Sequence, residues 1–93
     1  MGNYMVDINL PDTFDPEFAE LIPHQRAFTY KMMEKGTIIN YSLSMDRKKL
    51  WVIISAESIR EVKKVMSSFP IINYIRFTIH DLLLLVFPCI YSG

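Results

Sequence analysis

The sequence predicts an α+β fold in which two helices cover one face of a four-stranded antiparallel sheet. Three observations predict it. Strand-like and helix-like segments follow each other in the order βαββαβ, four polar residues join the second and third strand segments, and the segment before Pro70 has an apolar stripe at helical spacing. Strands with so short a connection must be antiparallel neighbours. A chain of 93 residues is long enough for one domain with a single core.

The first strand and the first helix are delimited by clear local signals. Residues 4–10 alternate in hydrophobicity and are rich in strand-forming residues. Asp15 is a favourable helix N-cap, and Pro16 suits the first helical position because its backbone lacks the N–H that this position leaves unused. We expect the helix to run to Lys35 and to stop at Gly36, the residue type most common just past a helix end.

The second half of the chain repeats the alternation of strand and helix. We expect strands at residues 37–45 and 50–54, a helix at 56–68 capped by Ser55, and a strand at 73–80. Right-handed crossovers in both halves give the ferredoxin-like βαββαβ sandwich, with residues 1–93 as one domain. We expect residues 82–93 to be a C-terminal extension that can pack on a neighbouring subunit.

Composition excludes several classes of function. Ten basic and ten acidic residues cancel, so no basic field attracts nucleic acid or an anionic membrane. The longest apolar run, residues 82–87, is too short to cross a bilayer. The single Cys89 and the two histidines do not form a metal-ligand cluster, and no cofactor motif is present. The start of the chain lacks a signal-peptide pattern, so we expect a cytoplasmic protein.

The polar residues of the first helix are the main candidates for a functional site. At about 100° per residue, Gln25 lies near the middle of the apolar arc and Thr29 lies within it. His24 and Arg26 lie on the two shoulders of that arc, and Pro23 lies opposite. Gln25 is then either a buried amide that binds its neighbours or, with Thr29, the roof of a pocket where the helix stands off the sheet. His24 and Arg26 are either ligand contacts or solvated flanks.

The strands offer further candidates. Asp7 is the carboxylate inside the first strand: facing the helices it would have a raised pKa and could move protons, and facing away it would be half-exposed. Tyr41, Trp51 and Arg76 are candidate ligand contacts. Arg76, Thr78 and His80 lie on one side of their predicted strand, and this row can also face solvent or a subunit interface. With half of the residues hydrophobic, we expect a second subunit to cover the other face of the sheet.

Two motifs carry a family resemblance. The helix end MEKGT (Met33–Thr37) and the stretch FPIINYIRFTI (Phe69–Ile79), together with the element order and length, resemble muconolactone delta-isomerase and its relatives. The resemblance covers nearly the whole chain up to about Leu85. It implies a dimeric α+β barrel, the group that also contains YciI-like proteins and small cofactor-free monooxygenases. In that group two subunits pack sheet against sheet, and ligands lie between sheet and helices. It also implies a homodimer or a higher homo-oligomer without a cofactor.

The family reaction shifts a proton between carbons of an unsaturated lactone that carries a carboxylate. In the relatives, the position two residues after the helix proline is ionisable; here it is Gln25, whose amide can bind a substrate but cannot exchange a proton at neutral pH. The resemblance therefore implies a cofactor-independent isomerase that uses another proton carrier. We expect catalysis by His24 or Asp7, and substrate binding by Gln25, Arg26, Thr29, Tyr41, Trp51 and Arg76.

Two other functions stay open at this point. The replacement of an ionisable group by Gln25 favours a non-catalytic dimeric module that binds a small ligand or serves assembly. The aromatic side chains of Tyr41, Trp51 and Tyr74 leave room for a cofactor-free monooxygenase that acts on an aromatic substrate.

Overall fold

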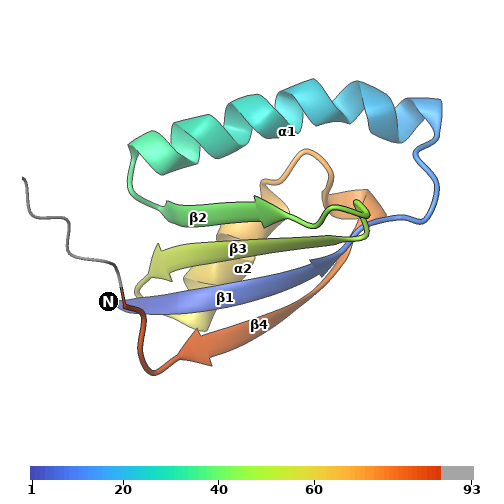
Figure 1. Cartoon of the computed structure of the whole chain (residues 1–93). Coiled ribbons are helices and arrows are strands. Elements are labelled where there is room, and N and C mark those ends of the chain that lie inside the picture. Colours follow the sequence, from blue (N-terminus) through green and yellow to red (C-terminus); the bar gives the residue numbers. More distant parts are fainter. Residues whose placement is uncertain (87–93) are drawn as a thin grey trace, which may run out of the picture.

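The computed structural model describes residues 1–86 and confirms the predicted α+β fold. Figure 1 shows one twisted sheet with both helices on the same face. The predicted C-terminal extension lies mostly outside the described residues. The elements in chain order are β1 (Gly2–Asn9), α1 (Pro16–Glu34), β2 (Ile38–Leu43), β3 (Lys49–Ala56), α2 (Ile59–Ser67), the 3-10 turn η1 (Ile72–Tyr74) and β4 (Arg76–Leu82).

The strand order is that of two interleaved βαβ units. The sheet runs β2-β3-β1-β4, and all neighbouring strands are antiparallel. Each helix therefore connects two strands that point the same way and that enclose a strand of the other unit, as in ferredoxin-like folds. The short β2–β3 connection joins antiparallel neighbours, as the sequence predicted.

The predicted boundaries hold for α1 and shift for α2. Asp15 caps α1, with the Oδ1 atom accepting a hydrogen bond of 2.9 Å from the Phe18 backbone N–H, and Gly36 follows the helix with φ +78°. The prediction that Ser55 caps the second helix is wrong. Ser58 caps it instead, because β3 continues to Ala56 to pair with the start of β1.

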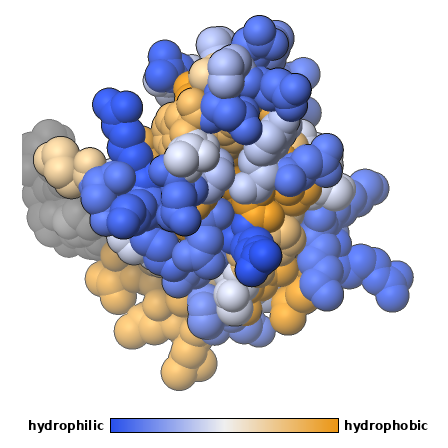
Figure 2. Space-filling model, turned by 90° about the vertical axis from the view of Figure 1, so that its right-hand side faces the viewer, coloured by the Kyte–Doolittle hydropathy of each residue, from blue (hydrophilic) through white to orange (hydrophobic). Residues whose placement is uncertain are grey.

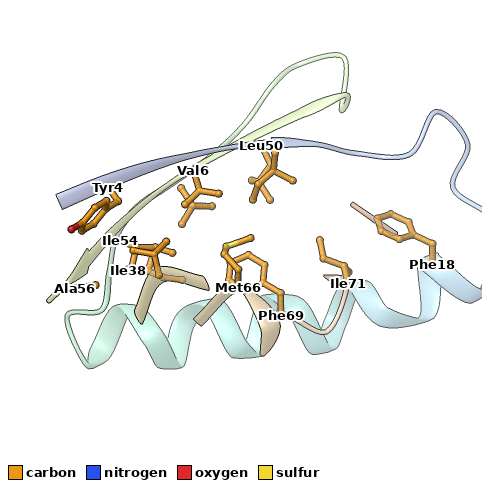
Figure 3. Packing of buried hydrophobic residues seen from close by; sticks show 13 residues of the cluster. Tyr4, Val6, Phe18, Ile38, Leu50, Ile54, Ala56, Met66, Phe69 and Ile71 are labelled. Atoms are coloured by element: carbon orange, nitrogen blue, oxygen red, sulfur yellow. The ribbon is translucent and has the colours of Figure 1, made fainter. Parts of the chain in front are cut away.

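The core lies between the sheet and the two helices. Side chains of the sheet, such as Val6 and Leu50, face Met66 and Phe69 from the helix layer, while Phe18 lies at one end of the cluster (Figure 3). All five are at most 2% exposed. Burying such side chains is the main stabilising contribution to a domain of this size.

The opposite face of the sheet, here called the open face, has no helix over it within residues 1–86 (Figure 1). Because Val6 and Ile8 point into the core, alternation along β1 places Asp7 on the open face. Strand pairing then places residues from each of the other three strands on the same face. These are Asn40 and Ser42 of β2, Lys49, Trp51 and Ile53 of β3, and Arg76, Thr78 and His80 of β4.

Candidate functional site

A cavity of about 230 Å³ lies between α1 and the sheet, toward the N-terminal half of that helix. Most of its wall is apolar: Phe18 and Ile22 of α1 face Leu50 of β3, and Ile71 closes one side. Figure 3 shows Phe18 at this end of the core, away from the more crowded end around Ile54. The cavity therefore lies at the level of Gln25, for which the sequence left both a satisfied buried amide and the roof of a pocket open.

Two buried polar residues of α1 line the cavity. Gln25 is 4% exposed and Thr29 is 3% exposed, which confirms that both belong to the buried face of the helix. Gln25 Nε2 donates to Thr29 Oγ1 at 3.2 Å, and Thr29 Oγ1 donates to the main-chain oxygen of Gln25 at 2.9 Å. The Ile71 backbone N–H donates to Gln25 Oε1 at 3.4 Å, a long contact that ties the amide to the segment after α2.

Tyr41 brings a third polar group to the same place from the sheet side. It belongs to β2, where its partner across the sheet is the fully buried Val52, so its ring points toward α1. Burial raises the pKa of the Tyr41 hydroxyl, and the Thr29 and Gln25 side chains that face it reduce the rise. A raised pKa keeps the hydroxyl neutral and able to donate a hydrogen bond at any pH near 7.

Charged and exposed groups border the entrance of the cavity. Arg26 and Tyr30 line it from α1 and are themselves exposed, and Leu43 lines it from the end of β2. Figure 2 views the end of the molecule where β1 leads into α1 and shows apolar surface in gaps between polar side chains. A ligand entering here would pass a cation at the rim before reaching the neutral polar groups inside.

Four of the predicted site residues meet at this cavity, namely Gln25, Arg26, Thr29 and Tyr41. His24 is not among the residues that line it. This histidine is exposed on α1, as is Pro23, so the proline does not turn it inward.

The other three predicted site residues lie on the open face of the sheet. Asp7 Oδ1 is 2.7 Å from Lys49 Nζ, an ion pair whose angles are not those of a hydrogen bond. Trp51 is the strand partner of Asp7, and Arg76 is paired with the neighbouring Asn9. The sheet therefore separates these three side chains from the cavity.

The apolar wall is the part of the cavity that the sequence analysis did not identify. Ile22 lies on the apolar arc of the first helix, Leu50 begins the strand predicted at residues 50–54, and Ile71 lies between the predicted second helix and last strand. Hydrophobic periodicity finds such residues but does not separate those that touch another side chain from those that border a space. The one available signal was the pair of polar residues, Gln25 and Thr29, within the apolar arc.

Within residues 1–86, no group of three or more His, Cys, Asp or Glu side chains lies close enough together to hold a metal ion. In the same part of the chain, no helix is long and apolar enough to cross a membrane. No protein-family model matches the sequence, and no curated protein matches it either.

Proposed function

We propose that the protein binds a small, mostly apolar organic molecule in the cavity between α1 and the sheet. The observation that carries the proposal is the placement of the Gln25–Thr29–Tyr41 cluster at the wall of an otherwise apolar space. Small-molecule sites typically combine such a wall with a few polar groups that fix orientation. The hydrogen bonds of Gln25 to Thr29 and Ile71 offset the cost of burying its amide, so the cluster is held in place at the cavity wall.

The size of the cavity suits a ligand of about one ring. An apolar protein cavity of about 150 Å³ accepts benzene, and sites for drug-sized molecules span about 300–1,000 Å³. At about 230 Å³ the present cavity has room for one six-membered ring with a short substituent.

Binding fits this lining better than the proton-shift isomerase that the family resemblance implies. An isomerase needs a group that takes up and returns a proton near neutral pH. Among the described residues, the ionisable groups that line the cavity are Arg26, Tyr30 and Tyr41, and none of them is a carboxylate or an imidazole. The isomerase is therefore the second candidate, supported by the donors Gln25 and Tyr41, which could stabilise an enolate oxygen.

Titration with toluene, followed by amide shifts in ¹H–¹⁵N NMR spectra, tests the binding proposal. We expect saturable shifts at Ile22, Thr29 and Leu50, which border the cavity. Leu43→Trp should weaken binding because it places a larger side chain at the rim. Leu83→Trp is the matched control on a fully exposed residue outside the lining. Shifts that fail to saturate, or that spread over the surface, would contradict the proposal.

An assay with unsaturated lactones separates the two candidates. For a binding protein we expect wild type to leave the lactone unchanged and to exchange none of its carbon-bound hydrogens in deuterium oxide. Gln25→Glu adds a carboxylate at the cavity wall and should allow exchange if the site can orient the lactone. If wild type converts the lactone and His24→Ala does not, the isomerase becomes the better-supported function.

We further infer that a second copy of the chain covers the open face of the sheet. Trp51 is 36% exposed on this face, so an aromatic side chain lies at the surface opposite the helices. Tryptophan is among the residues most often central to protein interfaces. A cytoplasmic location stays a prediction.

A further inference from the structure

We propose that the inner wall of the cavity is a subsite for a neutral carbonyl oxygen, bound by the Tyr41 hydroxyl and the Gln25 amide nitrogen. The ligand would then be a single-ring ketone, ester or amide. This inference rests on the proposed function, because it specifies which ligand the same cavity accepts.

The hydrogen bonds of Gln25 determine which way its amide points. Ile71 offers a backbone N–H, a donor only, so the atom that faces it must be the amide oxygen. The amide nitrogen then faces Thr29, whose hydroxyl already donates its hydrogen to the Gln25 main-chain oxygen and can only accept from Nε2. The orientation is therefore fixed by chemistry at both ends of the side chain.

This arrangement leaves donor hydrogens available at the cavity wall. Gln25 Nε2 carries two hydrogens, one of which is directed to Thr29. The Tyr41 hydroxyl faces Gln25 and Thr29, and hydrogen bonding with their side chains offsets part of the effect of burial on the pKa of Tyr41. The Gln25 Oε1 atom and the Thr29 Oγ1 atom both already accept a hydrogen bond. A ligand carbonyl oxygen, which has two lone pairs, can accept from both the second Nε2 hydrogen and the Tyr41 hydroxyl.

The surroundings favour a neutral acceptor over a carboxylate. The inner wall holds an amide and two hydroxyls, and burial of Tyr41 keeps its hydroxyl protonated. Arg26 is exposed at the rim and is the charged side chain among the described lining residues. Moving a carboxylate past that rim into a mostly apolar space would have a large desolvation cost without a cation to offset it.

A pair of probes with the same shape tests the subsite. Acetophenone and α-methylstyrene differ only in that a methylene group replaces the carbonyl oxygen. Two net hydrogen bonds should make acetophenone bind wild type about tenfold more tightly. The carbonyl stretching band of bound acetophenone, measured by infrared difference spectroscopy, should shift to lower wavenumber because the oxygen accepts hydrogen bonds.

Variants assign the effect to the two donors. Tyr41→Phe keeps the ring and removes the hydroxyl, so it should reduce the preference for acetophenone to about threefold and move the carbonyl band back toward its position in an apolar solvent. Gln25→Met should act in the same direction. Tyr74→Phe is the matched control, since Tyr74 binds Glu17 at 3.2 Å and does not line the cavity.

The affinities of the probes test the binding site, the carbonyl subsite, its two donors and the charge of the ligand separately. Equal affinity for both probes would overturn the subsite and leave the cavity as a binding site. Binding of neither probe would overturn the proposed function together with the subsite. A preference and a band shift that survive in Tyr41→Phe and in Gln25→Met would overturn the assignment of the donors. Tighter binding of benzoate than of acetophenone would overturn the neutral ligand and would indicate Arg26 as the recognition group.

Discussion

At the residue scale, the contact between Gln25 and Thr29 accounts for a buried amide in the middle of an apolar helix face. The two side chains are four residues apart, so they lie one above the other on α1. Thr29 links the amide nitrogen and the main-chain oxygen of Gln25, while Ile71 supplies the donor for the amide oxygen. The pair is satisfied locally, which lets the helix carry polar groups toward the cavity.

The first prediction concerns the stability that this pair contributes. Thr29→Val keeps the shape of the side chain and leaves the Gln25 amide nitrogen without its buried acceptor. We expect the free energy of unfolding in urea to fall by about 1–3 kcal/mol. Thr13→Val, on an exposed residue of the β1–α1 loop, is the control and should change it by less than about 0.5 kcal/mol.

A double-mutant cycle makes the test specific to the contact. Gln25→Met combined with Thr29→Val should cost less than the sum of the two single changes, because each single change already breaks the shared hydrogen bond. Strictly additive losses would show that the two side chains do not stabilise each other.

The second prediction concerns the pH dependence of stability from Tyr41. Its pKa in the folded protein is raised, chiefly by burial, above the value of about 10 expected in the unfolded chain. The folded state thus holds the proton more tightly. The contribution of Tyr41 to the free energy of unfolding is complete below about pH 10. It is lost as the pH rises from there through the folded-state pKa of Tyr41.

Urea unfolding of wild type and Tyr41→Phe between pH 8 and 11 measures this effect. The loss of stability at alkaline pH should be smaller in Tyr41→Phe than in wild type. Tyr30→Phe, which removes an exposed phenol from α1, should follow wild type. Parallel curves for wild type and Tyr41→Phe would contradict the prediction.

At the element scale, the β2–β3 turn contains the one backbone conformation among residues 1–86 that is unfavourable for its residue type. Arg47 has φ +62°, in the left-handed region that costs a residue with a β-carbon about 1–2 kcal/mol. The turn is supported by Asp46, whose Oδ1 atom accepts from the Ser44 hydroxyl at 2.6 Å and from the Lys48 N–H at 2.9 Å.

The third prediction follows from this strain. Arg47→Gly should raise the free energy of unfolding by about 0.5–1 kcal/mol, since glycine adopts positive φ without a steric cost, although it loses more entropy on folding. Lys48→Gly is the control at the next position, where φ is not positive, and should be neutral or destabilising. Thermal unfolding measures both. A higher free energy of unfolding in both variants would contradict the role of the positive φ at Arg47.

Sequence patterns predict elements well where one signal dominates and less well where two compete. The first helix begins at its expected cap, Asp15, because no other capping residue stands near that start with a following proline. The second helix was expected to be capped by Ser55 and is capped by Ser58. The choice is made by the pairing of β3 with the start of β1, a contact between distant parts of the chain that no local pattern contains.

The same distinction applies to the candidate site. The burial of Gln25 and Thr29 follows from helical periodicity, which is a local property. The face occupied by Asp7 depends on which side of the sheet receives the helices, and strand alternation alone leaves both faces possible. For that reason the sequence could identify Asp7 as a candidate but could not separate it from the cavity.

At the scale of the whole molecule, the two helices cover one face of the sheet and, within residues 1–86, leave the other face open. The open face mixes the Asp7–Lys49 ion pair with Trp51 and with Ile53, which is 8% exposed. A surface that carries both charge and apolar groups resembles an interface between soluble subunits more than the interior of a domain. A two-fold axis through this face would place the two sheets against each other and would keep both cavities on the outside.

The fourth prediction is that the protein is a dimer that dissociates when the open face is altered. The chain has a mass of 10.9 kDa. Light scattering over a concentration series should give twice this mass at micromolar concentration. Trp51→Lys should shift the protein to monomer, because it removes the aromatic contact and places like charges opposite each other across a two-fold axis. Glu20→Lys, on the exposed side of α1, adds a lysine away from the open face and should leave the dimer intact. A wild-type monomer throughout the series would contradict the dimer. Loss of the dimer in Glu20→Lys alone would move the interface from the open face to α1.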